Sequence, residues 1–315
     1  MEGTSVGREE NRYKLKKVKS YLSVLTSVKK IKKIEPILYL IPSFIIFILF
    51  VFYPFIKTII TSMSITNRRG EIKEFVGLEN FKEILTSQEF YNSIGVTFKF
   101  VLMVVIPSII IGLILALLAN NRLRGNRIFE LVFSLPMAIA SAPAAIIWTM
   151  IFHPTNGVLN YVLGTQTGWL IDPKYALISV AIVTVWLNIG INFIFLLTGL
   201  RNVPDELIES ASLDGAGYFD RLKNIVMPII SPQMFLVVFM NLMNAFQAFG
   251  QIKLLTQGGP GESTNVLVHS IYREAFFNGR FEMASAQSII LFIIMFVVTI
   301  LQFKYEKKGV HYQWC

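Results

Sequence analysis

Three things that soluble and secreted proteins normally contain are scarce in this sequence. A single cysteine in 315 residues leaves no disulfide framework. Charged residues make up 16% of the chain against 54% hydrophobic residues, a balance too apolar for a soluble globular protein. The polar segment 1–35 holds no apolar run followed by small cleavage-site residues, so we expect no cleavable signal peptide. The composition therefore predicts a chain embedded in a lipid bilayer.

Motifs for nucleotide, dinucleotide and metal chemistry are missing as well. There is no Walker loop, no GxGxxG and no HExxH. His153, His269 and His311 are far apart, and each is better explained as a loop or interfacial residue than as a ligand. We therefore expect no catalytic residue, no metal site and no cofactor in this chain. Nothing in it favours nucleic acid as a partner.

Ionisable side chains are almost absent from the centres of the long apolar segments. Proton- or sodium-coupled carriers keep such groups there, although each costs about 2.5–3.5 kcal/mol or more. This absence argues against a secondary transporter and against a membrane enzyme that uses acid–base chemistry. If the chain moves a solute uphill, the energy must come from a partner.

What the sequence does contain is six apolar segments of spanning length. Crossing a hydrocarbon core of about 30 Å takes roughly 20 residues. Pro136 and Pro143 interrupt the third segment, and prolines are tolerated where neighbouring helices or cavity water satisfy the freed carbonyls. The sequence thus predicts an all-α, polytopic membrane protein with a tail at 1–35, a transmembrane domain at 36–305 and a tail at 306–315. The predicted spans are 36–63, 95–119, 131–153, 175–199, 228–250 and 284–304.

The distribution of Lys and Arg predicts the orientation of these spans. With the N-terminus inside the cell, the inner segments carry 19 of these residues and the outer segments carry 8. The tail at 1–35 is basic enough to touch anionic lipid. We therefore expect both termini, and the loop 204–228 between the fourth and fifth spans, to be cytoplasmic.

That loop is a polar segment between two apolar segments. A short helix is predicted from Pro204, and acidic residues place negative charge near the positive end of its dipole: Asp205, Glu206 and Glu209. The run Asp-Gly-Ala-Gly at 214–217 then breaks the helix. A side chain at Gly215 is expected to obstruct this turn. A second helix follows, with three apolar residues on one side: Phe219, Leu222 and Val226.

The same loop resembles the EAA loop of permease subunits of ATP-binding-cassette (ABC) importers. The matching residues are Glu209, Ser210, Ala211, Asp214, Gly215, Ala216 and the pair Met227-Pro228. The resemblance implies a type I ABC importer permease fold in which these helices couple to a separate ATPase dimer that binds ATP and Mg²⁺. It also implies a second, homologous permease subunit, an extracytoplasmic solute-binding protein and a bacterial or archaeal cell membrane.

Other segments resemble the carbohydrate-uptake group of these permeases, which includes maltose and glycerol-3-phosphate importers. They include Phe152-His153-Pro154, the run LTQGGP at 255–260 and Ile271-Tyr272-Arg273. The C-terminal run, with SAQS at 285–288 and QFKY at 302–305, is closest to glycerol-3-phosphate permease A subunits. This resemblance implies sn-glycerol-3-phosphate or glycerophosphodiesters as the solute, with a di- or oligosaccharide as the alternative.

Uncharged polar residues recur at helical spacing in the fourth and fifth spans. Asn188 and Asn192 are four residues apart beside Trp186, and Asn241 and Asn244 share a face. Such amides either hydrogen-bond neighbouring helices, at roughly 0.6–2 kcal/mol each, or face a pathway for a hydroxylated solute. Resemblance to the maltose permease implies a substrate pathway at Leu187, Asn188, Ile191, Asn241, Asn244, Ala245 and Ala248.

Two further classes of protein stay open at this point. A receptor or assembly scaffold could bind an ATPase through the same loop without transporting anything. A channel or secondary carrier would keep transporting when the ATPase is removed.

Overall fold

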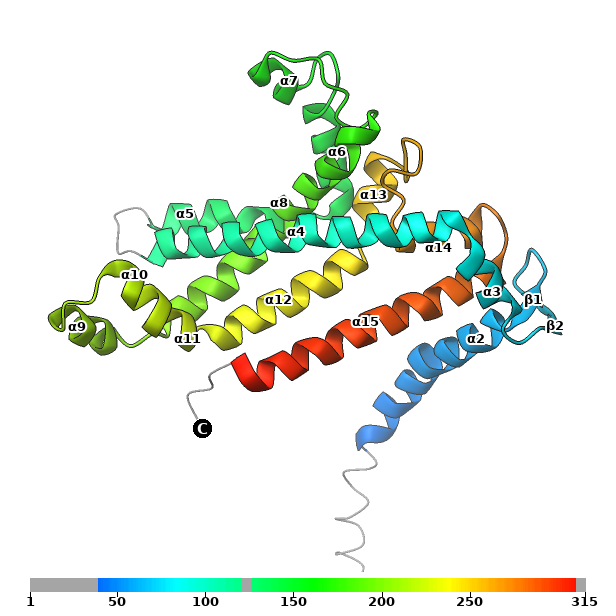
Figure 1. The fold of residues 1–315 in the computed structure, drawn as a ribbon, viewed down its shortest axis with the longest axis horizontal. Helices are drawn as coiled ribbons and strands as arrows, with labels where there is room; N and C mark the ends of the chain where they lie inside the picture. Colours follow the sequence, from blue (N-terminus) through cyan, green and yellow to red (C-terminus); the bar gives the residue numbers. More distant parts are fainter. Residues whose placement is uncertain (1–38, 121–125, 310–315) are drawn as a thin grey trace, which may run out of the picture. The chain divides into compact units, whose positions relative to one another are not determined.

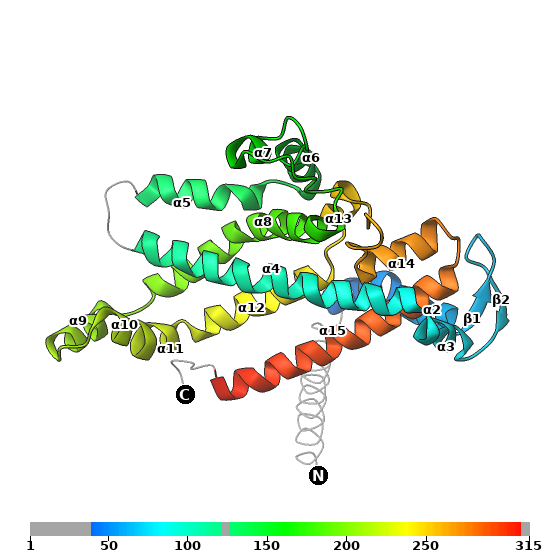
Figure 2. The ribbon, with the colours of Figure 1, turned by 45° about the horizontal axis from the view of Figure 1, so that its top comes forward.

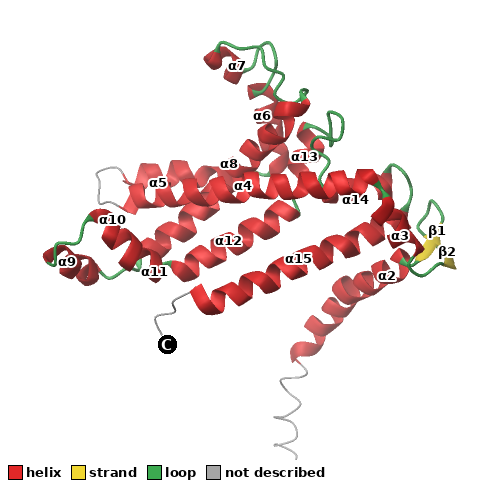
Figure 3. Ribbon diagram, in the orientation of Figure 1, coloured by secondary structure: helices red, strands yellow, loops and turns green. Residues whose placement is uncertain are grey.

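The computed structural model describes residues 39–120 and 126–309 (Figures 1 and 3). The basic tail at 1–35 and the end of the C-terminal tail, 310–315, lie outside the described residues. The expected helical class is confirmed. The only strands in the described part of the chain, β1 (Ser64–Thr66) and β2 (Ile72–Phe75), form a short antiparallel hairpin. The chain divides into two units, residues 1–58 and Ile59–Cys315, which are considered separately.

The described part of the first unit is helical and apolar. It contains η1 (Ile48–Phe52) and most of α2 (Tyr53–Ser62), within one continuous helix from Tyr39 to Ser62. This helix is long and apolar enough to cross a membrane, and it matches the predicted span at 36–63. Its large side chains are exposed, including Phe44, Phe50 and Tyr53. A surface of this kind requires lipid or protein around it.

Four helices of the second unit lie side by side in both ribbon views (Figures 1 and 2). They are α4 (Gln88–Asn120), α8 (Pro173–Arg201), α12 (Ser231–Phe246) and α15 (Phe281–Gly309). The start of α8 follows from its sequence, since the side chain of Asp172 accepts a hydrogen bond from the Lys174 backbone N–H at 2.8 Å. Aliphatic and aromatic side chains of α4 and α8 form the core between them, including Phe100, Val104, Val180 and Val183.

Two of the predicted spans are broken. Around the third, α5 (Asn126–Ser134) and η2 (Leu135–Ala138) meet α6 (Ser141–Ile151) at a bend of 103°. Pro136 lies in η2 and Pro143 in the first turn of α6, so the prolines flank the break. Around the fifth, the helical stretch Tyr218–Ile229 meets α12 at 71°. The described residues thus contain four helices long and apolar enough to cross a membrane, or up to six crossings if each bent pair is one span.

Shorter elements close the two ends of the second unit. At one end, called here the α9 end, lie α9 (Asp205–Leu213) and the stretch made of α10 (Tyr218–Arg221), η3 (Leu222–Val226) and α11 (Met227–Ile229) (Figure 1). The opposite end, called the α14 end, holds the hairpin, α3 (Glu79–Thr86) and α14 (Leu267–Phe276). Elsewhere α7 (Val158–Leu163) follows α6, and α13 (Gly250–Leu255) follows α12.

The directions of the long helices follow from what meets at the α9 end. Asn120, the last residue of α4, and Arg201, the last residue of α8, line the same cavity. The two helices therefore run the same way, and the chain between them must return to the opposite end before α8 begins. Ser231 at the start of α12 and Tyr305 near the end of α15 line another cavity, so these two helices run in opposite directions.

Candidate functional site

The loop predicted to contact an ATPase is a helix–turn–helix. Pro204 is the cap residue, and α9 begins at Asp205, one residue later than predicted. Gly215 has φ +85° and lies in the turn that ends α9. Its N–H donates to Ser212 O at 3.1 Å. The Ala216 N–H donates to Ala211 O at 2.9 Å. This pair of bonds is a Schellman motif, in which glycine supplies the left-handed residue that closes a helix.

The expected reason for glycine at 215 is wrong. A Cβ built on Gly215 would have no atom within 4 Å, so a side chain would not obstruct the turn. The requirement comes from the backbone, because φ +85° is a conformation that L side chains rarely adopt.

The seven predicted coupling residues are arranged around an accessible surface. Glu209, Ser210, Asp214 and Gly215 are exposed, while Ala211, Ala216 and Pro228 are half-buried. Two large apolar side chains beside them are more exposed still: Leu213 at 89% and Phe219 at 78%. Phe219 does not share a surface with Leu222 and Val226, which are half-buried and line a cavity. The predicted apolar face is therefore split, with Leu222 and Val226 on the cavity and Phe219 of α10 on the outside.

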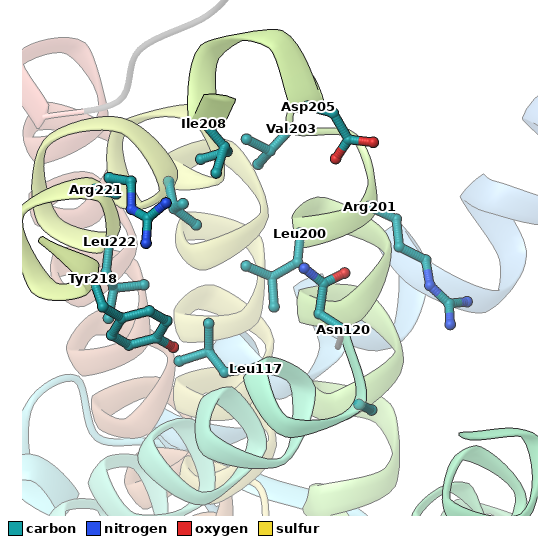
Figure 4. A pocket seen from close by; sticks show the side chains of 12 residues that line it. Leu117, Asn120, Leu200, Arg201, Val203, Asp205, Ile208, Tyr218, Arg221 and Leu222 are labelled. Carbon is teal, nitrogen blue, oxygen red and sulfur yellow. The ribbon is translucent and has the colours of Figure 1, made fainter. Parts of the chain in front are cut away.

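A cavity of about 530 Å³ lies behind this loop (Figure 4). Leu117 and Asn120 of α4, Leu200 of α8, and Tyr218 and Arg221 of α10 line it. Arg221 donates to the Ser212 hydroxyl, which ties the two helices of the loop to each other. Arg201 pairs with Glu130 of α5. The loop is thus cross-linked internally. Beside the cavity, its Val226 and Met227 pack in the same hydrophobic cluster as Ala116 and Ala119 of α4.

Two amides of the spans form a buried pair. Asn192 of α8 and Asn241 of α12 donate to each other's side-chain oxygens at 3.2 and 2.7 Å. The Asn241 amide also donates to the Val237 carbonyl at 2.8 Å. For this pair the helix-packing alternative holds, since both side chains are satisfied inside the chain.

The remaining predicted pathway residues fall into three environments. Ala245 and Ala248 are buried in the core. Leu187, Asn188 and Ile191 are half-buried on α8, and Asn244 is exposed on α12. The Asn188 side-chain nitrogen is buried without a hydrogen-bond partner in the described residues. Asn188 and Asn244 are therefore the two amides of this set without a side-chain hydrogen bond inside the described residues.

The α14 end carries a polar and aromatic cluster to which the sequence analysis assigned no role. Arg273 pairs with Glu89 and Glu262, and Arg280 lies beside Glu83 and Glu274. His269 shares a hydrogen bond of 2.9 Å with Asn265. Burial lowers the pKa of His269, and the charge of Lys253 lowers this pKa further. The four-residue spacing alone could not have predicted this bond, because Asn265 lies in the loop before α14 and His269 in the first turn of the helix.

Comparison with known proteins agrees with this architecture. The sequence model of the family described as "Binding-protein-dependent transport system inner membrane component" matches residues 108–308, well over half of the chain. The chain is 35% identical over 247 residues to the sn-glycerol-3-phosphate transport system permease protein UgpA of Agrobacterium fabrum, covering 77% of this chain and 84% of that protein. It is 34% identical over 248 residues to UgpA of Escherichia coli O157:H7, covering 78% and 84%.

Solved structures share the fold. A bacterial ABC transporter involved in the import of the acidic polysaccharide alginate matches with a TM-score of 0.80 at 21% identity, covering 89% of this chain and 98% of that chain. A chain of the MetNI methionine ABC transporter matches with a TM-score of 0.52 at 14% identity, covering 74% and 99%. The chain is a transport component rather than an enzyme. It belongs to the family of binding-protein-dependent transport system inner membrane components, the permease subunits of ABC importers.

Proposed function

We propose that this permease forms half of the pathway of an ATP-driven importer for sn-glycerol-3-phosphate or glycerophosphodiesters. The observation that carries the proposal is identity of 34–36% over most of the chain to permeases named for sn-glycerol-3-phosphate. The alternative is a di- or oligosaccharide, which the exposed amide of Asn244 and the ring of Trp186 would suit.

The proposed topology has six crossings, with the α9 end and both termini in the cytoplasm. The shared direction of α4 and α8 supports it, because the bent pair α5–α6 then has to cross between them. The excess of Lys and Arg in the segments assigned to the inside supports the orientation.

In the proposed mechanism, an ATPase dimer docks on the exposed surface of α9 and the turn after it. That surface offers Glu209, Ser210 and Asp214 for polar contacts, and Leu213 and Phe219 for apolar ones. ATP and Mg²⁺ are bound by the ATPase subunits and not by this chain. When ATP closes the dimer, the loop moves as one body because Arg221 holds its helices together, and the spans repack.

The proposed solute pathway lies between this chain and a second, homologous permease, with lipid on the outside. A solute-binding protein delivers the solute to the α14 end. Asn188 and Asn244 are assigned to hydrogen-bond the solute, because their amides both donate and accept. Leu187 and Ile191, on the same helix as Asn188, line the pathway.

Uptake by a reconstituted complex tests the proposal. Proteoliposomes containing both permeases and the ATPase, supplied with binding protein outside and ATP inside, are expected to accumulate labelled sn-glycerol-3-phosphate. Accumulation of a saccharide instead would replace the proposed substrate. Accumulation without ATP or without the ATPase would indicate a channel or secondary carrier, and binding of the ATPase without any uptake would indicate a scaffold.

Gly215→Asp tests the coupling role in the same vesicles. A side chain at φ +85° distorts the turn that presents the docking surface, so ATP hydrolysis is expected to continue while uptake is lost. Gly164→Asp is the matched control, because Gly164 also has a positive φ (+63°) with open space around it but follows α7. Equal uptake by the two variants would contradict a coupling role for the loop.

A further inference from the structure

Lys253 of α13 is a cation held against aromatic rings. Its ammonium lies 4.8 Å from the centre of the Tyr272 ring and 4.7 Å from the centre of the Phe277 ring. Phe249, at 4.9 Å between ring centres, packs on Tyr272 from the side of α13. The Lys253 side chain is half-buried, so the rings shield it only in part.

The charge of Lys253 is not neutralised within the part of the chain that the structure describes. No ion pair links it to a carboxylate there, whereas Arg273 and Arg280 at the same end each lie against two glutamates. Its charge acts on His269, whose pKa it lowers together with burial. Lys253 therefore creates a local positive potential that only an outside anion can satisfy.

Lys253 also lies directly beyond the proposed solute segment of α12. The helix stops at Phe246, and α13 begins at Gly250 after a break. Gly250 approaches α6 so closely that a Cβ there would lie 2.8 Å from the Ser141 hydroxyl oxygen. Ile252 and Leu255 anchor α13 in the same core as Ala248. Along the chain α13 thus lies between α12, which carries Asn244, and α14, against which Lys253 packs.

A phosphate monoester needs such a cation. It carries about −1.5 to −2 charges at neutral pH, and the amides of Asn188 and Asn244 cannot neutralise that charge. We propose that Lys253 is an entry-side binding residue for the phosphate group of the solute, contacting it as the solute passes from the binding protein to the α8–α12 pathway. This inference rests on the proposed function and adds to it the group that recognises phosphate in this chain.

Substitution of Lys253 tests the inference in the reconstituted complex with saturating loaded binding protein. Lys253→Gln is expected to slow uptake of sn-glycerol-3-phosphate by about 10- to 100-fold, because it removes one hydrogen bond between charged groups. Lys253→Arg keeps the charge and is expected to restore most of the rate. The matched control is Lys174→Gln, because the Lys174 ammonium also lies over a ring, 5.3 Å from the centre of Tyr175, but at the start of α8.

A charge-rescue experiment covers the case in which the Gln variant fails to assemble. The chain has one cysteine, so Lys253→Cys in a Cys315→Ser background can be modified after assembly. A methanethiosulfonate reagent bearing an ammonium group is expected to raise the uptake rate, and one bearing a sulfonate is expected to lower it.

The outcomes separate the two levels of the proposal. A wild-type complex that transports a saccharide and no phosphate ester overturns the proposed substrate. If the wild-type complex transports the phosphate ester, either of two results overturns the role of Lys253 alone. One is an equal uptake rate for Lys253→Gln and Lys174→Gln, and the other is an equal effect of the two methanethiosulfonate reagents on Lys253→Cys.

Discussion

Gly258 shows how closely the loop before α14 packs on a histidine. Its φ is +86°, and a Cβ on it would lie 2.6 Å from Cε1 of the buried His269 ring. Gly258→Ala must displace that ring and weaken its bond to Asn265. We expect a loss of stability of about 1–3 kcal/mol from the backbone and about as much again from the clash. Thermal unfolding of the purified complex measures it.

Gly261→Ala is the matched control in the same loop. Gly261 also has a positive φ (+54°), but nothing lies within 4 Å of its Cβ position. It therefore carries only the backbone part of the penalty. Identical shifts in the unfolding midpoint for the two alanine variants would mean that the contact with His269 contributes nothing.

At the residue scale, the sequence predicts local turns better than contacts between side chains on different helices. The turn at 214–217 was predicted correctly because glycine and aspartate carry their backbone preferences locally. The pairing of Asn192 with Asn241 was not, because it depends on how α8 and α12 cross. The exposure of Leu213 and Phe219 was missed for a similar reason, since an amphipathic pattern cannot show which apolar side chains the fold leaves uncovered.

At the element scale, apolar length predicts where the long helices lie but not how far they continue past the apolar run. The span predicted at 95–119 ends one residue before α4 does, but α4 begins seven residues earlier, at Gln88. Those first residues are too polar to read as membrane, and Glu89 among them pairs with Arg273 of α14. The break at the third span follows from its two prolines, but the end of α12 at Phe246 does not follow from any proline or glycine before it.

Gly112 sets the distance between α4 and α8. A Cβ at this position would lie 2.8 Å from the Asn192 Cβ, so the two backbones approach as closely as a glycine permits. Gly112→Ala is expected to push the helices apart, to disturb the Asn192–Asn241 pair and to destabilise the subunit by about 1–3 kcal/mol. The unfolding midpoint of the complex reports this loss.

Gly95→Ala in the same helix is expected to have the opposite sign. A Cβ there meets no atom within 4 Å, and alanine is favoured over glycine inside a helix by about 0.5–1 kcal/mol. A destabilisation by Gly95→Ala as large as that of Gly112→Ala would contradict the role of the contact with α8, because helix propensity favours alanine at both positions.

At the scale of the whole molecule, the number of crossings decides on which side the docking loop lies. Asn120 and Arg201, the last residues of α4 and α8, line one cavity, so both helices must end on the same side of the membrane. This is possible if the bent pair α5–α6 crosses the membrane between them, and both helices can then end in the cytoplasm. If the pair does not cross, Arg201 and the loop after it lie on the side opposite to Asn120. The Lys and Arg bias of the sequence and the directions of the helices agree on the first arrangement.

Cysteine labelling in a Cys315→Ser background distinguishes these arrangements in intact cells. Gln166, after α7, and Lys223, in η3, are both exposed, so a cysteine at either position can react. An impermeant maleimide is expected to label Gln166→Cys from outside and to label Lys223→Cys only after permeabilisation, which also confirms that each thiol is reactive. Labelling of Lys223→Cys from outside, and of Gln166→Cys only after permeabilisation, is the pattern expected if the bent pair does not cross. The loop after α8 would then be separated from any cytoplasmic ATPase. Labelling of both cysteines from the same side would contradict a single crossing by α8, the one long helix between them.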